Sequence, residues 1–279
     1  MVSPINYKFL KNKEVKNIDE FIFIVHPDDL IIYEVVRIID GKILFLKDHI
    51  DRFFSSFHHA GLIPAIGSEE LANRLDLLIK SNNNIEVGNI KFQLVFSNTA
   101  KTSEFLAYFI PHSYPSEEQY NNGVSVAISE ALRTQPNAKI QHTALLETLN
   151  RIMEEEKVYE VILVHPEGYI TEGSRSNLFM IKNNEVYTPK VTDILPGITR
   201  KYILQVCKDL NLILNERRIF RDELFAMDAL FITGTSPKVL PIRNIYYANF
   251  DVKHPVLRLI MKKFDELIEN YLKNSPNFF

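Results

Sequence analysis

The sequence has no tryptophan and only one cysteine among its 279 residues. A single cysteine cannot form an intramolecular disulfide, and such low usage is typical of a reducing compartment. Cys207 falls within an apolar helical pattern with Tyr202, Ile203, Val206 and Leu210. This pattern favours a small buried hydrophobic side chain over a catalytic thiol.

The sequence also lacks a charge excess and a long apolar run. Its formal net charge is −3, so no basic field indicates binding to nucleic acid or to an anionic membrane. No stretch reaches the roughly 18 uncharged apolar residues of a membrane helix. The first residues, Met1 to Asn6, lack the basic and apolar regions of a signal peptide. We therefore expect a soluble cytoplasmic protein with no nucleic-acid or membrane partner.

Most short catalytic motifs are absent as well. The chain contains no CxxC, HExxH, GxSxG or GxGxxG pattern and no Walker-type glycine loop. His58 and His59 are adjacent in a predicted helix, so their side chains diverge by about 100° and cannot readily share a metal ion. No metal site is expected.

Length and pattern predict two domains that contain both helices and strands, an α+β or α/β fold. The chain exceeds the roughly 100–200 residues that one domain usually takes. Residues 113–123 are polar and have no apolar period, so we interpret them as a linker. They would separate an N-terminal α/β domain, residues 1–112, from a C-terminal domain, residues 124–279.

Local patterns predict the main elements. The β-rich run from Ile31 to Ile39 precedes the hairpin signal Asp40-Gly41 and a return strand from Lys42 to Leu46. Asp48 is expected to cap the helix that follows. Further helices are predicted at 68–79, 143–156, 198–210 and 254–272, and further strands at 90–96, 105–110, 124–128, 158–164, 178–181 and 229–233.

Two segments have the chemistry of anion sites. Asp193 to Arg200 is a Pro-Gly loop that runs into a predicted helix, and the free N–H groups and positive dipole end of a helix start attract anions. The alternative is a plain helix start with Thr199 as the cap. Phe231 to Ser236 brings hydroxyls and a glycine directly after a buried strand, which suits a phosphate or a plain turn equally well.

Two side chains could hold a charged aromatic cofactor. Arg52 projects from a predicted helix, and its guanidinium suits bidentate binding of phosphate. Taken alone, however, Arg52 is more typical of a surface arginine. Glu172 lies in a Gly/Ser loop that enters a strand. It could be a solvated turn acid or an anion held against a pyridinium nitrogen.

In order along the chain, these segments resemble the class IV pyridoxal-phosphate enzymes: branched-chain aminotransferases, D-amino acid aminotransferases and aminodeoxychorismate lyases. Each motif alone is weak, but six in family order with fitting spacing are a specific signal. The resemblance covers about residues 20–245. The matching stretches are Tyr33 to Arg37 with Asp40-Gly41, His49 to Arg52, Ala138-Lys139, Thr171 to Phe179, Ile194 to Arg200 and Thr233 to Ser236.

The resemblance implies the D-amino acid aminotransferase-like fold, fold type IV, with the cofactor pyridoxal 5'-phosphate bound by the C-terminal domain. Lys139, which in isolation would be taken for a surface lysine, would carry the cofactor as a Schiff base and later move a proton at the substrate α-carbon. Glu172 would pair with the pyridine nitrogen and keep it protonated. The other implied cofactor residues are Arg52, Ile198, Thr199, Thr235 and Ser236 around the phosphate, Gly197 at the same helix start, and Leu195 against the ring.

The implied activity is amino transfer between an amino acid, branched-chain amino acids included, and a 2-oxo acid, in a homodimer. Two alternatives stay open: a lyase-like enzyme that releases pyruvate from aminodeoxychorismate, and a cofactor-binding protein with little catalysis. The substrate half departs from the family pattern. Val25 to Ile32 lacks the usual glycines and aromatic residue, Phe96 or Ser97 stands where D-amino acid enzymes have arginine, and Ile140 to Thr143 matches neither of the other subgroups.

Overall fold

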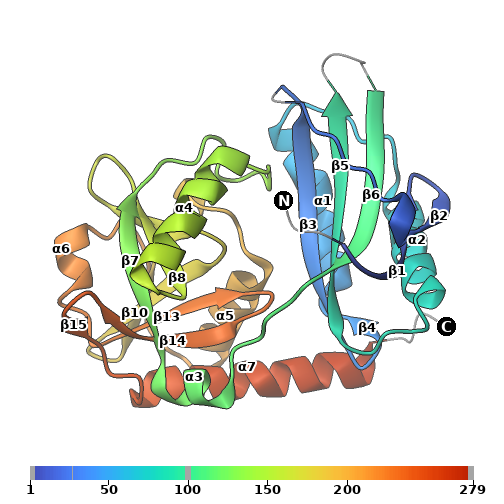
Figure 1. Ribbon diagram of the computed structural model, residues 1–279. Coiled ribbons are helices and arrows are strands. Elements are labelled where there is room, and N and C mark those ends of the chain that lie inside the picture. Colours follow the sequence, from blue (N-terminus) through green and yellow to red (C-terminus); the bar gives the residue numbers. More distant parts are fainter. Residues whose placement is uncertain (1–3, 27, 98–101, 276–279) are drawn as a thin grey trace. The chain divides into compact units, whose positions relative to one another are not determined.

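The computed structural model describes residues 4–26, 28–97 and 102–275. The chain divides into two compact units (Figure 1). The first comprises residues 1–113, 138–141 and 268–279, and the second comprises residues 114–137 and 142–267. The domain boundaries expected from the linker pattern stay predictions. Residues 113–123 include helix α3 (Glu117–Asn122), whose N-cap Ser116 accepts a hydrogen bond from the Gln119 amide.

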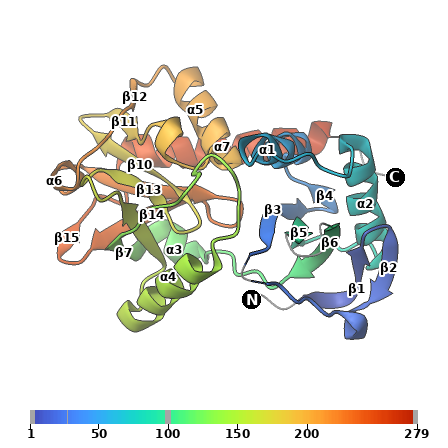
Figure 2. The same cartoon turned by 90° about the horizontal axis from the view of Figure 1, so that it is seen from above.

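The first unit is an antiparallel sheet with two helices on one face (Figures 1 and 2). Its strand order, over the described residues, is β2-β1-β6-β5-β3-β4. Alternate apolar residues such as Ile32, Val36 and Phe92 meet Phe53 of α1 and Leu75 of α2 in one core. The elements are β1 (Ile5–Lys11), β2 (Glu14–Asn17), η1 (Ile18–Glu20), β3 (Leu30–Ile39), β4 (Lys42–Ile43), α1 (Leu46–His59), α2 (Ser68–Ser81), β5 (Gly88–Ser97) and β6 (Thr102–Ile110).

The expected hairpin at Asp40-Gly41 is confirmed. Both residues have positive φ, 50° and 73°, as the two central residues of a type I′ turn require. The expected helix start is wrong. Strand β4 stops at Ile43, and α1 begins at Leu46, which leaves Asp48 inside the first turn. Phe45 takes the N-cap position in a left-handed conformation, and its ring packs edge-on against Tyr271 at 4.8 Å between centroids. The buried Phe45 ring, and not the Asp48 side chain, therefore marks the start of α1.

The second unit is built on a mixed sheet with the strand path β12-β11-β10-β13-β14-β7-β8-β9, with β15 beside β14. Helix α4 packs through Leu149 against Ala127, Val161 and Leu163 of strands β7 and β8. The elements are β7 (Val124–Glu130), α4 (Thr143–Glu156), β8 (Glu160–Val164), β9 (Ile170–Gly173), β10 (Asn177–Lys182), β11 (Glu185–Thr188), η2 (Val191–Asp193), α5 (Ile198–Asp209), β12 (Leu214–Glu216), α6 (Arg221–Leu224), β13 (Ala229–Gly234), β14 (Lys238–Ile245), β15 (Ala248–Asn249) and α7 (Pro255–Asn274), the last of which ends in the first unit.

Two further expectations concern single features. Cys207 is free and fully buried, and burial raises the pKa of its thiol to about 12, so the interpretation as a core residue is confirmed.

Within the described part of the chain, no helix is both long enough and apolar enough to cross a bilayer.

Candidate functional site

Lys139 lies in a short segment that adds to the sheet of the first unit. Ile140 forms an isolated antiparallel bridge with Ile32 on β3, and the Tyr33 amide donates to the Lys139 carbonyl at 3.1 Å. The Lys139 amide donates to Ser56 Oγ at 3.0 Å, and Ser56 Oγ donates to the Arg52 carbonyl at 2.9 Å. Backbone bonds thus hold both ends of this residue, while its Nζ lies 4.9 Å from the centre of the Tyr33 ring.

Arg52 is buried, so the surface interpretation of this arginine is wrong. Its Nε and Nη2 donate to the two carboxylate oxygens of Glu34, each at 2.7 Å, and the Glu34 side chain is fully buried on β3. His49 Nδ1 lies 2.9 Å from Glu34 Oε2. Burial lowers the pKa of His49 despite this contact, so at neutral pH a neutral imidazole donates to the carboxylate. Glu34 therefore orients the guanidinium through two bonds.

The Glu34 carboxylate makes the stability of the first unit depend on pH. Burial by itself would raise the pKa of Glu34, but Arg52 and His49 more than reverse this effect and hold it at about 2, against an ordinary value of 4.5. The native state therefore binds fewer protons than the unfolded chain between these values. A difference of this size corresponds to about 3 kcal/mol of unfolding free energy, which is complete above about pH 5 and is lost as the pH falls toward 2.

Glu34→Gln is expected to lower the free energy of unfolding at neutral pH by about 3–5 kcal/mol, because the buried Arg52 loses its counter-charge. The variant should also lose less stability than the wild type between pH 5 and pH 2. Urea denaturation at a series of pH values measures both effects. Glu69→Gln, at an exposed position on α2, is the matched control, and an equally steep acid loss in the Glu34 variant would contradict the assignment.

Glu172 is the central acid of the second unit. It is 4% exposed at the end of β9. Its Oε2 accepts from the Leu195 amide at 3.2 Å and from Asn177 Nδ2 at 3.4 Å, and its Oε1 lies 3.3 Å from Arg133 Nε. The first two contacts are hydrogen bonds and the third is an ion pair, and all three suit a carboxylate. The alternative of a solvated turn acid is therefore wrong.

The loop after Glu172 is held by a second buried acid, Glu160 on β8. Ser176 Oγ donates to it at 2.9 Å, the Val161 amide at 2.9 Å and the Ser174 amide at 3.1 Å, and Ser174 Oγ donates as well. A Cβ at Gly173 would collide with Ser176 Oγ, so only glycine fits there. The Ser174 carbonyl in turn accepts from Arg133. Glu160 therefore holds the loop that directly follows Glu172 in the chain. Arg133 is hydrogen-bonded to the same loop.

The Pro-Gly loop leads into α5 as expected, but its cap is different. The N-cap is Gly197 and makes no side-chain hydrogen bond, so Thr199 lies in the first turn and the cap expected at Thr199 is wrong. Asn177 Nδ2 donates to the Leu195 carbonyl at 2.9 Å, and its Oδ1 approaches Gly197 so closely that a Cβ there would collide with it. The loop before α5 is thus connected to Glu172 by hydrogen bonds through Asn177 and the Leu195 amide. The first-turn N–H groups of α5, at Ile198 and Thr199, follow directly after this loop.

The hydroxyl segment forms the turn after β13. Thr233 is the threonine near the end of β13 and is 1% exposed, and its Oγ1 has no hydrogen-bond partner among the described residues. Thr235 and Ser236 are half-buried in the turn that leads to β14. A buried hydroxyl without a partner is costly and rare, so the Thr233 hydroxyl carries donor capacity that no described residue uses.

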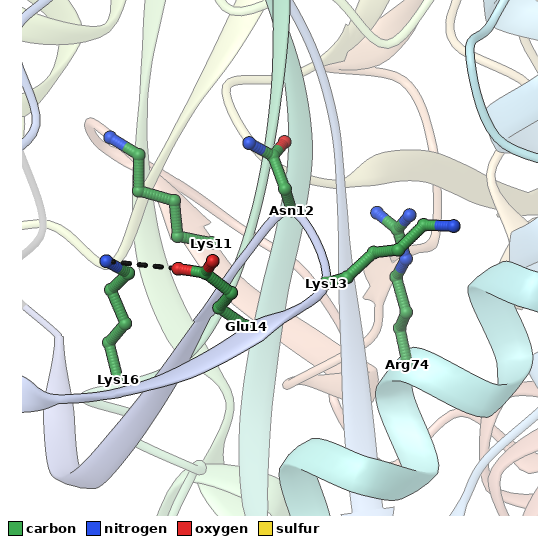
Figure 3. A pocket seen from close by; sticks show the side chains of 6 residues that line it. All are labelled: Lys11, Asn12, Lys13, Glu14, Lys16 and Arg74. Carbon is green, nitrogen blue, oxygen red and sulfur yellow. Dashed lines mark ion pairs between the residues drawn. The ribbon is translucent and has the colours of Figure 1, made fainter.

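One hollow in the first unit is not lined by any of these residues. It measures about 420 Å³, and its cations are Lys11, Lys13, Lys16 and Arg74 (Figure 3). Each forms an ion pair with a glutamate, at distances from 2.6 to 3.3 Å. In the second unit, by contrast, a hollow of about 170 Å³ is lined by both Glu172 and Arg133.

Sequence reasoning missed several residues that the structure brings to these groups. Glu34 had a usable signal, because a glutamate between Ile32 and Val36 on an alternating strand must be buried and therefore paired. Arg133 and Glu160 had none, because their partners lie many residues away along the chain. The roles assigned to the cofactor residues stay predictions.

Comparisons with known proteins agree with the sequence motifs. Residues 31–245 match the profile of the amino-transferase class IV family. The chain is 31% identical over 224 residues to the D-alanine aminotransferase of Bacillus licheniformis, covering 77% of this chain and 78% of that one. It is 29% identical over 257 residues to a branched-chain-amino-acid aminotransferase of Pseudomonas aeruginosa, covering 85% and 83%.

Among solved structures, the branched-chain amino acid aminotransferase of Escherichia coli superposes with a TM-score of 0.85. The alignment covers 95% of this chain and 95% of that one at 21% identity. The two chains therefore share a fold, and the expected fold type IV is confirmed.

Proposed function

The chain belongs to the class IV aminotransferase family, and we propose that it transfers an amino group between an amino acid and a 2-oxo acid with pyridoxal phosphate held on Lys139. The observation that carries this proposal is the buried Glu172 carboxylate, which accepts two hydrogen bonds and forms an ion pair with Arg133 at the start of a loop that Glu160 holds in place. Branched-chain amino acids and D-alanine are the first donors to test, because they are the substrates named in the two similar proteins above.

The residues present fit the cofactor. When bound, it supplies an aldehyde that condenses with amines and a ring that takes up an electron pair. An acid surrounded by donors, such as Glu172, suits a protonated ring nitrogen as one further donor. The Thr233 hydroxyl, which has no partner within the described ranges, and the first turn of α5 suit a phosphate, as do the hydroxyl side chains of Thr235 and Ser236.

The protein side chains have separate tasks in the proposed reaction. In the second unit, Gly197, Ile198, Thr199, Thr235 and Ser236 would hold the phosphate, and Leu195 would lie against the ring. In the first unit, Arg52, oriented by Glu34, would supply a guanidinium suited to a phosphate. Glu172 would keep the ring nitrogen protonated. Lys139 would hold the cofactor through its amine, and the same amine, once free, would move a proton at the substrate α-carbon. The anchored backbone of Lys139 leaves only its side chain to move.

Covalent labelling tests the proposal. The purified protein is expected to be yellow, and borohydride reduction followed by peptide mapping should place the cofactor on Lys139. Lys91 is the lysine against which Lys139 is best compared, because the Nζ atoms of both lie close to the Tyr33 ring, at 5.0 Å and 4.9 Å from its centre. A label on Lys91, or on any other lysine, would overturn the assignment.

A pair of assays separates amino transfer from the alternatives. Amino transfer to 2-oxoglutarate supports the proposal, whereas pyruvate release from aminodeoxychorismate without amino transfer would favour the lyase. Bound cofactor whose spectrum does not respond to any amino donor would favour a binding protein with little catalysis. The homodimer and the cytoplasmic location stay proposals; the free, buried Cys207 supports a reducing compartment.

A further inference from the structure

The hollow of about 420 Å³ in the first unit lies between the β1–β2 hairpin and helix α2 (Figure 3). Four of the six side chains that line it are cations and one is an anion. Such an excess of positive charge in a hollow attracts anions. The lining residues are Lys11, Asn12, Lys13, Glu14 and Lys16 from the hairpin and Arg74 from α2.

The cations around this hollow outnumber the acids that pair with them. Lys13 Nζ and Arg74 Nη2 contact the same oxygen, Glu70 Oε1, at 3.1 Å and 2.6 Å. The other two cations have one carboxylate each, so among the described residues four cations meet three carboxylates. The Lys13 and Glu70 side chains are 78% and 39% exposed, and exposed ion pairs of this kind are weak. An incoming anion can therefore compete with Glu70 for the two cations.

Arg74 and Asn12 have donor groups that the described residues do not use. Arg74 Nη2 donates to Glu70 Oε1 at 2.6 Å, whereas Arg74 Nε is buried and has no hydrogen-bond partner in the described ranges. The guanidinium carbon lies 4.9 Å from the centre of the Phe105 ring, a contact that limits its movement. Asn12 Oδ1 accepts from the Phe105 amide at 3.0 Å, which fixes the orientation of the side-chain amide, and Asn12 Nδ2 donates to none of the described residues. Two held side chains at the wall of the hollow thus have unused donor capacity.

Lysines on a hairpin of this kind have a second use. β2 is an edge strand of the sheet, and lysines on an edge strand discourage pairing with another chain. This use accounts for Lys16 on β2. It does not account for Arg74, which comes from a helix and whose side chain is only 11% exposed. The grouping of Arg74 with Lys13 and Asn12 therefore indicates a ligand.

We propose that the hollow binds a phosphate group, either as inorganic phosphate or as the phosphate of a small ester. Arg74 and Lys13 supply the charge, because a phosphate can replace the Glu70 carboxylate that they share. Asn12 Nδ2 supplies a neutral donor. None of the described side chains that line the hollow is aromatic, so a nucleobase has no surface to stack on there. The site uses none of the residues assigned to the cofactor, and the inference does not depend on the proposed function.

Calorimetric titration with inorganic phosphate tests the inference, with the protein first saturated with pyridoxal phosphate so that the site of the cofactor phosphate is filled. At low ionic strength, where exposed charges are screened least, the wild type should bind phosphate with a Kd of about 1 mM. Lys13→Gln should weaken binding about 10-fold, as the loss of one charge-assisted hydrogen bond does. Lys47→Gln is the matched control and should bind like the wild type, because Lys47 on α1 is similarly exposed and is also ion-paired, to Asp51.

Glu70→Gln should strengthen phosphate binding about 3- to 10-fold, because it releases Lys13 and Arg74 from the carboxylate that competes with the ligand. A gain in affinity cannot arise from damage to the fold. Asp51→Asn, which releases Lys47 from its own acid, should leave the affinity unchanged. No binding by the wild type up to about 10 mM phosphate, equal affinities of Lys13→Gln and Lys47→Gln, or an unchanged affinity in Glu70→Gln would each overturn the inference.

Chemical modification locates the site. Phosphate should protect Lys13 from acetylation by acetic anhydride while Lys47 reacts as before, and peptide mass spectrometry measures both lysines. Equal protection of the two lysines would mean nonspecific ion binding and would overturn the inference. Glycerol 3-phosphate separates the two sources of the phosphate group. Tighter binding of this ester than of inorganic phosphate assigns an ester as the ligand, and equal or weaker binding assigns the free ion.

Discussion

Lys139→Ala is expected to lower the turnover number about 10⁴-fold, the upper end of what a positioned acid–base residue contributes. The amine both carries the cofactor and moves the proton, and alanine can do neither. The fold should persist, because the bonds to Ser56 and Tyr33 are made by the Lys139 backbone. Single-turnover absorbance measurements with leucine and D-alanine measure the effect.

Lys139→Arg separates amine chemistry from charge. Arginine restores the positive charge, but its guanidinium stays protonated and cannot act as the nucleophilic amine. Both variants should therefore be similarly inactive, while Lys80→Ala should behave as the wild type. Substantial amino transfer by either Lys139 variant would mean that another lysine carries the cofactor, and Lys91 would then be the first to examine.

Glu172→Gln is expected to slow amino transfer by about 10²–10⁴-fold while the cofactor stays bound. The amide cannot hold a proton on the ring nitrogen as a carboxylate does, so the ring becomes a weaker electron sink. The substitution also replaces one acceptor oxygen with a donor, although the Leu195 amide, Asn177 and Arg133 all need acceptors. Steady-state kinetics and the pH dependence of the cofactor absorption measure the two aspects.

Glu167→Gln is the matched control for this variant. It lies in the exposed turn between β8 and β9 and forms a surface ion pair with Arg218 at 3.0 Å. The control should keep both the rate and the absorption spectrum. If Glu172→Gln turned over like the control, with an unchanged spectrum, Glu172 would not be the partner of the ring nitrogen.

The fold followed from local patterns where the chain itself imposes the geometry. Asp40 and Gly41 tolerate positive φ, so the hairpin between β3 and β4 was predictable from two residues. The apolar spacing of α4 was equally informative, since the expected helix at 143–156 is the observed one. The start of α1 was not predictable from Asp48, because the packing of Phe45 against Tyr271 joins residues more than 200 positions apart.

The sequence by itself determined the family, because six short motifs can be recognised from the types and order of their residues. This recognition requires no knowledge of which residues the motifs contact. Only the tertiary structure decided which side chains those motifs meet. The Glu34–Arg52 pair, the Arg133–Glu172 pair and the position of Lys91 beside Tyr33 arise from strand register and from long-range bonds. A strand pattern tells which residues share a face, but it does not tell which strand pairs with it or in which register. The partners and the burial of each charged side chain could therefore not be predicted from the sequence.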